Sequence, residues 1–120
     1  MPDRPDADLR ETPVATEQVY DGALLDVRRD EAALPDGTTG TREWINHPGA
    51  SAVVPLLEGG DTLLVRQFRY AARRTFLEVP AGKIDHADEA PLDVAARELE
   101  EETGWRAATV TPVGRMYPCI

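Results

Sequence analysis

The sequence predicts an α+β fold, on three observations. Short stretches of β-favouring residues alternate with turn signals before residue 80. The stretch 91–103 instead has apolar residues at steps of three and four, which is typical of an amphipathic helix. The 120 residues are 42% hydrophobic and 29% charged, as in an ordinary globular protein of one domain.

Charge and cysteine content exclude several classes of protein. The net charge of -9 argues against a nucleic-acid binder, whose affinity rests on Lys and Arg. We expect no membrane partner either, because no apolar stretch approaches the roughly 18 residues that span a bilayer. The single cysteine, Cys119, cannot form an intrachain disulfide. With no apolar signal segment near Met1, a reducing and therefore cytoplasmic location is expected.

The N-terminal part is expected to form a small antiparallel sheet. Residues 1–13 are polar and proline-punctuated, which predicts a disordered arm. Mixed apolar and polar residues over 17–27 favour strands. The turn signal Pro35-Asp36-Gly37 separates stretches 28–34 and 38–46, which predicts a hairpin. We assign 14–48 to this sheet, as a dimerisation segment.

The remainder, 49–120, is expected to form the second part. Its apolar stretches predict strands, separated by turns and by a polar loop at 83–90. The expected strands are 52–57, 62–70, 76–79 and the start of another at 110–113.

The helix is predicted over 91–103. Proline is well tolerated in the first helical turn, and Gly104 suits the C-terminal cap. The expected apolar stripe is formed by residues at helical spacing: Leu92, Ala95, Ala96, Leu99 and Thr103.

Several carboxylates crowd the last turns of this helix. Glu98, Glu101 and Glu102 share one face, whereas Glu100 points away. Like charges at this spacing repel, and a helix C-terminus is already negative. A divalent cation would reverse that repulsion, since Mg²⁺ and Mn²⁺ prefer carboxylate oxygens. The alternative is a solvated acidic face, which the helix alone predicts equally well.

The residues around the helix resemble the Nudix box, G-x5-E-x7-REUxEExGU with U apolar. The sequence has Gly82, then six residues, Glu89, and after seven more Arg97 to Trp105 as RELEEETGW. Every specified residue from Glu89 onward matches, and one extra residue follows Gly82. Alternatively, Asp88 holds the glutamate position; we favour Glu89 because the helix fixes its spacing to Arg97.

The resemblance implies a Nudix-type α/β/α sandwich that binds Mg²⁺, or Mn²⁺. By position, the implied metal ligands are Glu98, Glu101, Glu102 and the backbone carbonyl of Ala81. Glu98, Glu101, Glu102 and Arg97 are the implied catalytic residues. Arg97 and Glu89 are expected to form a structural ion pair.

Flanking segments resemble the ADP-ribose pyrophosphatase subgroup: TREW, VRQFRY and LEVPAGKID. The resemblance implies a homodimer, with Trp44 stacking on adenine and Arg69 contacting phosphates. The alternative for Trp44 is a place in the sheet or dimer core. Surface solubility better explains Arg66, Arg73 and Arg74.

The implied activity is divalent-metal-dependent hydrolysis of nucleoside diphosphate sugars, most of all ADP-ribose to AMP and ribose 5-phosphate. The family sandwich normally continues well past the box, with a loop that often supplies the general base. We therefore expect an incomplete Nudix domain, truncated at the C-terminus, with the base beyond Ile120. The alternative is a non-catalytic nucleotide-binding or dimerisation module.

Overall fold

The computed structural model describes residues 9–86 and 88–117, which form two compact units divided between His47 and Pro48. The expectations for residues 1–8, for Cys119 and for the chain end after Tyr117 lie outside this range. Each unit is described by itself. Among the described residues, no helix has the length and apolar character needed to cross a membrane.

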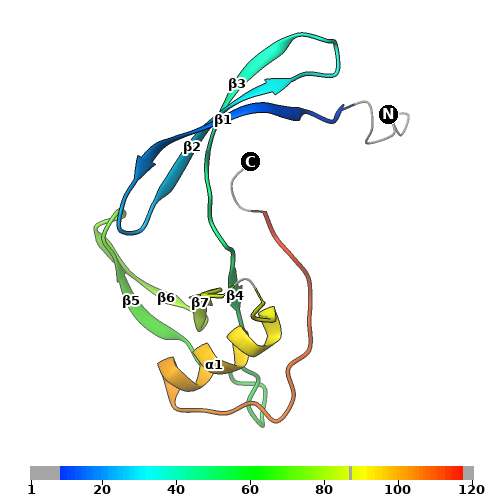
Figure 1. Cartoon of the computed structure of the whole chain (residues 1–120). Helices are drawn as coiled ribbons and strands as arrows, with labels where there is room; N and C mark the ends of the chain where they lie inside the picture. The colour runs from blue at the N-terminus through cyan, green and yellow to red at the C-terminus, as the bar shows by residue number, and fades with distance from the viewer. Residues whose placement is uncertain (1–8, 87, 118–120) are drawn as a thin grey trace. The chain divides into compact units, whose positions relative to one another are not determined.

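The first unit is an antiparallel sheet in the order β1-β2-β3 (Figure 1). Its strands are β1 (Thr12–Asp21), β2 (Asp26–Ala33) and β3 (Thr39–Ile45). The predicted hairpin is confirmed: Ala33 pairs with Thr39, and the Leu34 amide donates to the Thr38 carbonyl at 2.8 Å. Gly37 has a φ of 86°, a conformation that favours glycine in this turn.

The start of β1 corrects one expectation. Thr12 and Pro13 lie in the strand, opposite Ala33 and Ala32, although 1–13 is expected to be disordered. Pro13 occupies an edge strand, where a missing N–H can be tolerated. A polar, proline-containing segment can therefore pair when a neighbouring strand supplies the ladder.

The second unit contains two short antiparallel pairs and a helix. Strand β4 (Ala50–Ala52) pairs with β7 (Ala81–Lys83), and β5 (Val65–Arg69) pairs with β6 (Arg74–Glu78). Helix α1 (Pro91–Thr103) contacts both β4 and β7 (Figure 1). The predicted helix bounds are confirmed, and Gly104 caps its end with a φ of 75° and an N–H bond to the Glu100 carbonyl.

Two predicted strands are wrong in this unit. In the stretch 52–57 only Ala52 belongs to a strand, since Pro55 lacks the N–H that a ladder needs. Leu56 forms only an isolated bridge with Thr62 and is 79% exposed. The stretch 110–113 is not a strand, and Val113 is fully exposed. Apolar residues do not form a strand without a partner to receive their backbone hydrogen bonds.

The apolar stripe of α1 is also displaced from its predicted position. Val94, Ala95 and Leu99 are buried, whereas Leu92 is 40% exposed. Glu98 completes the packed face, with its side chain only 13% exposed. The prediction therefore left out Val94, which is fully buried, and Glu98, whose carboxylate occupies part of the packed face.

Shortening Leu99 to alanine is expected to destabilise the second unit by about 2–5 kcal/mol, because a buried Leu side chain leaves a cavity when truncated. Leu92→Ala, on the same helix but largely exposed, is the matched control. Chemical denaturation followed by circular dichroism measures both. Equal small losses in the two variants would contradict this packing.

Candidate metal-binding site

The site is built where α1 crosses β7. Gly82 lies in the middle of β7, opposite Ser51 of β4. A Cβ on Gly82 would overlap the carboxylate carbon and both oxygens of Glu98. No positive φ demands glycine at this position, so the close approach of Glu98 is what requires it. The sequence therefore has a glycine here to admit a carboxylate.

Glu102, one helical turn further on, is fixed to the same strand. Its Oε2 accepts the backbone N–H of Ala81 at 3.1 Å. Glu98 and Glu102 thus both lie against β7, as the i,i+4 spacing on one helix face requires. The structure shows that the Ala81 amide donates to Glu102. The role of the Ala81 carbonyl as a metal ligand stays a prediction.

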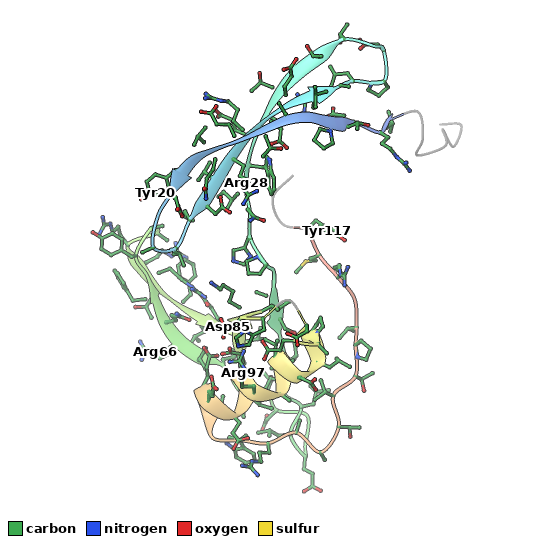
Figure 2. The ribbon with its side chains drawn as sticks, in the orientation of Figure 1. Tyr20, Arg28, Arg66, Asp85, Arg97 and Tyr117 are labelled. Carbon is green, nitrogen blue, oxygen red and sulfur yellow. The ribbon has the colours of Figure 1, made fainter. Side chains whose placement is uncertain are left out.

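Arg97 holds the carboxylates from the other side. Its Nη1 lies 2.7 Å from Glu98 Oε1 and 3.3 Å from Glu101 Oε2. Its Nε lies 3.2 Å from Glu89 Oε1, so the predicted ion pair with Glu89 is present. Asp85 is a further partner at 3.7 Å, and Figure 2 shows Asp85 and Arg97 together beside α1. One guanidinium therefore partly neutralises four carboxylates.

The loop before the helix is organised by the same contacts. Glu89 Oε2 accepts the Asp85 backbone N–H at 3.3 Å, and the Lys83 carbonyl accepts Arg97 Nη2 at 3.5 Å. These bonds favour Glu89 over Asp88 as the box glutamate, since Glu89 is the residue that links the loop to Arg97. Asp85 was not identified from the sequence, because a single acidic residue in a polar loop gives no signal of its own.

Charge and burial act on Glu89 and Arg97 in opposite directions. Desolvation is the largest single influence on Glu89 and raises its pKa. The hydrogen bonds from Arg97 and the Asp85 amide, with the Arg97 charge, outweigh it and leave the pKa lowered. The pKa of Arg97 is raised by its bond to Glu89, against desolvation, and by the charges of Glu89, Glu98 and Glu101. Arg97 is therefore held as a cation.

The carboxylates of this face are not grouped as the ligands of one metal ion in the described part of the chain. Within 9–86 and 88–117, no three carboxylate, imidazole or thiol groups form a metal-binding cluster. Glu98 and Glu101 each bond to Arg97, and Glu102 bonds to the Ala81 amide. The donor chemistry nevertheless fits a hard divalent cation: three carboxylates share one face, and Gly82 leaves the space that Glu98 occupies. Binding by Glu98 and Glu101 would require their side chains to rotate away from Arg97.

Substituting Gly82 by alanine tests this close approach. The added methyl group must displace the Glu98 carboxylate, which is the far end of a flexible side chain. We expect the fold to persist and Mn²⁺ affinity to fall about 10–100-fold, the usual cost of disturbing the support of a metal ligand. Gly114→Ala, where nothing lies near the added Cβ, is the control. Isothermal titration compares the two; unchanged affinity in Gly82→Ala would contradict the arrangement.

Arg69 lies on the β5–β6 hairpin of the same unit. Its Nε and Nη2 donate to Glu78 at 2.9 and 2.5 Å. This hydrogen bonding raises the pKa of Arg69, and the charge of Glu102 adds to the effect. Arg73 and Arg74 instead lie over the rings of Tyr70 and Phe76, at 3.6 and 4.6 Å from the ring centroids. Arg69 is thus bonded to a carboxylate, whereas Arg73 and Arg74 lie over aromatic rings.

Trp44 belongs to the other unit, on β3. Its indole N–H donates to Asp30 Oδ2 at 3.0 Å, and the Arg28 guanidinium lies 5.9 Å from its ring centroid. The side chain is 40% exposed. It is therefore a ring held in one orientation on a sheet surface, with part of its area accessible.

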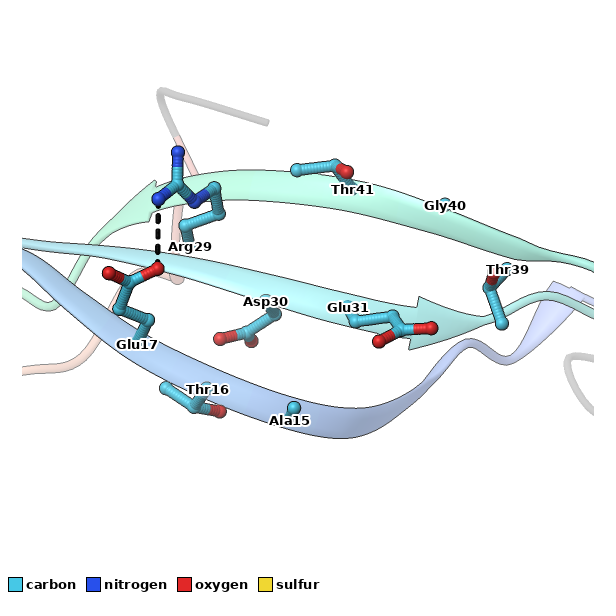
Figure 3. Close-up of a pocket in the computed structure, with 9 residues that line it drawn as sticks. All are labelled: Ala15, Thr16, Glu17, Arg29, Asp30, Glu31, Thr39, Gly40 and Thr41. Carbon is cyan, nitrogen blue, oxygen red and sulfur yellow. Dashed lines mark hydrogen bonds and ion pairs between the residues drawn. The ribbon is translucent and has the colours of Figure 1, made fainter.

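An open hollow of about 380 Å³ lies on the N-terminal sheet. Figure 3 shows its polar lining, in which Arg29 and Glu17 form an ion pair at 2.8 Å. None of the predicted site residues lines it. Arg29 and Glu17 pair across β1 and β2, and Asp30 accepts the indole N–H of Trp44 through Oδ2.

The fold and the site define a class of protein: an α+β unit in which a helix presents several carboxylates beside a strand glycine and a bridging arginine. The chain belongs to the Nudix family, because the NUDIX domain model matches residues 46–118. A second model, the nucleoside diphosphate sugar hydrolase N-terminal domain, matches residues 11–45. These matches confirm the family resemblance drawn from the box.

Similar proteins support the same placement. An ADP-ribose pyrophosphatase of Bacillus subtilis is 40% identical over 91% of this chain and 58% of its own length. Another, of Mycobacterium tuberculosis, is 41% identical over 80% of this chain and 46% of its own length. A methanol dehydrogenase activator of Bacillus methanolicus is 38% identical, over 81% and 52%. The chain thus spans about half the length of these relatives.

A solved structure agrees with the fold. The crystal structure of an ADP compounds hydrolase superposes with a TM-score of 0.70 and 25% identity. The match covers 85% of this chain and 55% of that one. The expected Nudix-type α/β fold is confirmed for the part of the sandwich that this chain spans.

Proposed function

We propose that the chain carries the metal-binding part of a hydrolase that cleaves the diphosphate bond of nucleoside diphosphate sugars. ADP-ribose is the proposed substrate, giving AMP and ribose 5-phosphate. The observation that carries the proposal is the carboxylate face of α1, in which Glu98 lies against Gly82 and Glu102 accepts the Ala81 N–H. The relatives named ADP-ribose pyrophosphatase support the substrate class.

Glu98, Glu101 and Glu102 are the proposed holders of Mg²⁺ or Mn²⁺. When bound, such a cation neutralises phosphate oxygens and lowers the pKa of an attacking water. Arg97 keeps Glu98 and Glu101 in place and ties the 84–90 loop to the helix. The Arg97 charge thereby offsets the repulsion among the carboxylates before any ligand arrives, and a bound cation would take over that role as the side chains turn away from Arg97.

Arg69 and Trp44 are the proposed substrate-binding residues. Arg69 offers a fixed positive charge to diphosphate oxygens, and its lasting protonation supports that role. Trp44 offers an oriented, partly accessible ring, on which an adenine base can stack with about 1–3 kcal/mol.

A homodimer in the cytoplasm completes the proposal. The N-terminal sheet exposes large apolar side chains, among them Val14 at 61%, Tyr20 at 57% and Ile45 at 53%. Such a surface favours association with a second copy. Sedimentation equilibrium tests this point: a species of twice the 13.2 kDa chain mass supports it, and a monomer at micromolar concentration contradicts it. The cytoplasmic location rests on the single cysteine.

The alternative function is a module that binds nucleotides without hydrolysing them. Incubation with ADP-ribose and Mg²⁺, followed by phosphorus NMR, separates the two. Appearance of AMP and ribose 5-phosphate supports the hydrolase. Saturable ADP-ribose binding without product supports the module, and absence of both contradicts the proposed substrate.

A further inference from the structure

The β5–β6 hairpin carries an ion pair that runs along its length. Arg69 is paired in register with Arg74, next to the turn, whereas Glu78 stands opposite Val65 at the other end. The two nevertheless bond through Nε and Nη2 of the guanidinium to both carboxylate oxygens. Arg69 and Glu78 share one face of the pair, as the alternation of side chains requires. The Arg69 side chain is therefore laid along the strands toward Glu78.

This direction leads toward the carboxylate face of α1. Glu78 ends β6, and Ala81, three residues later, bonds to Glu102. The charge of Glu102 also contributes, as the smallest of the causes, to the raised pKa of Arg69. In the described part of the chain, Glu78 is the group that the Arg69 side chain bonds to.

The bonding pattern leaves donors for a ligand. A guanidinium has five N–H groups, and Glu78 engages the one on Nε and one on Nη2. The other N–H groups, including both on Nη1, donate to no group in the described part of the chain. The bidentate bond also fixes the plane of the guanidinium, so the direction of these donors is set. With 51% of the Arg69 side chain exposed, they are accessible.

We propose that Glu78 is a positioning residue, which orients Arg69 so that its remaining N–H groups meet the diphosphate oxygens of the substrate. This inference rests on the proposed phosphate contact of Arg69. A purely structural role is a poorer explanation, because a partly exposed ion pair contributes little to stability. Glu78 was not identified from the sequence, since its partner lies nine residues away on another strand.

The direction in which Glu78→Gln changes the affinity for phosphate ligands distinguishes a positioning role from a simple effect of its charge. Glu78→Gln removes a negative charge beside the anion site, and Coulomb's law alone predicts tighter binding of a diphosphate. Positioning predicts the reverse: with Arg69 free to rotate, binding of inorganic pyrophosphate and ADP-ribose should weaken about 10-fold. Glu100→Gln, which removes one charge on the far side of α1, is the matched control. Adenosine, which has no phosphate, should bind all variants equally.

A double-substitution cycle shows whether Glu78 acts through Arg69. Arg69→Met should weaken binding of both phosphate ligands at least as much as Glu78→Gln does. The double variant should then bind no more weakly than Arg69→Met alone, because the group that Glu78 orients is already gone. Additive losses would mean that Glu78 acts independently, and would overturn the proposal.

The NMR signal of the Arg69 Nε–H gives a test that requires no ligand. It should exchange slowly in the wild-type chain and rapidly in Glu78→Gln. Tighter or unchanged pyrophosphate binding in Glu78→Gln, or no pyrophosphate and ADP-ribose binding by the wild type, would overturn the positioning role. If ADP-ribose binds with the expected cycle and is not cleaved, the hydrolase proposal fails and the positioning role stands.

Discussion

Replacing Glu102 by glutamine is expected to lower the rate of ADP-ribose cleavage about 10²–10³-fold, the usual effect of removing one group that stabilises developing charge. The glutamine keeps the shape of the side chain and can still accept the Ala81 N–H through its amide oxygen. It loses the charge that a divalent cation requires. Mg²⁺ affinity should therefore fall with the rate, while the thermal midpoint of unfolding stays close to that of the wild type.

Glu100→Gln provides the control for Glu102→Gln. Glu100 lies on the same helix, and its carboxylate pairs with Arg106 at 2.5 Å. The net charge changes equally in both variants, but only Glu102 belongs to the face that contacts β7. If the two substitutions reduced rate and Mg²⁺ affinity alike, a general loss of negative charge would explain the effect, and the assigned site would be wrong.

Replacing Arg97 by methionine is expected to lower activity about 10–100-fold by releasing the supports of the metal ligands. Glu98 and Glu89 would remain 13% and 19% exposed with no guanidinium beside them. The hydrogen bonds from Arg97 to Glu89, Glu98 and Glu101 would all be lost. Amide exchange in the 84–90 loop should accelerate. Arg106→Met, at an exposed pair on the same unit, is the control.

The loss of stability caused by Arg97→Met is expected to become smaller as the pH falls. In the wild type the pKa of Glu89 lies below 4.5, so Glu89 stabilises the fold above that pH and ceases to do so as the pH falls through its folded value. In Arg97→Met, desolvation should instead raise this pKa, and the charged form becomes unfavourable at neutral pH. The difference in thermal midpoint between the two chains should narrow as the pH falls from the raised pKa of Glu89 in the variant through its lowered pKa in the wild type. A constant difference would contradict the assigned partner.

The sequence was most informative where structure is local. Helix α1 is bounded by Pro91 and by Gly104, and its spacing is visible in adjacent residues, so its bounds were predictable. The first hairpin follows from the turn at Pro35-Asp36-Gly37. Strand expectations failed at 52–57 and 110–113, because a strand depends on partners distant in the sequence.

The site likewise has features that could be predicted from the sequence and features that depend on the fold. Three glutamates on one face follow from helix geometry, and the ion pair of Glu89 with Arg97 follows from the family resemblance. The close approach of Glu98 to Gly82 depends on how α1 crosses β7, which no spacing reveals. Asp85 and Glu78 join the network only through the folded loop and hairpin. Arg97 also changes the expected account of the helix, because it offsets part of the repulsion among the glutamates.

Paramagnetic mapping with Mn²⁺ tests the central claim most directly. Added in steps to the isotope-labelled chain, Mn²⁺ should saturably broaden the amide signals around Ala81, Gly82, Glu98 and Glu102, and excess Mg²⁺ should reverse the broadening. Broadening spread evenly over acidic surface residues, or none that saturates, would contradict a cation site on this face of α1.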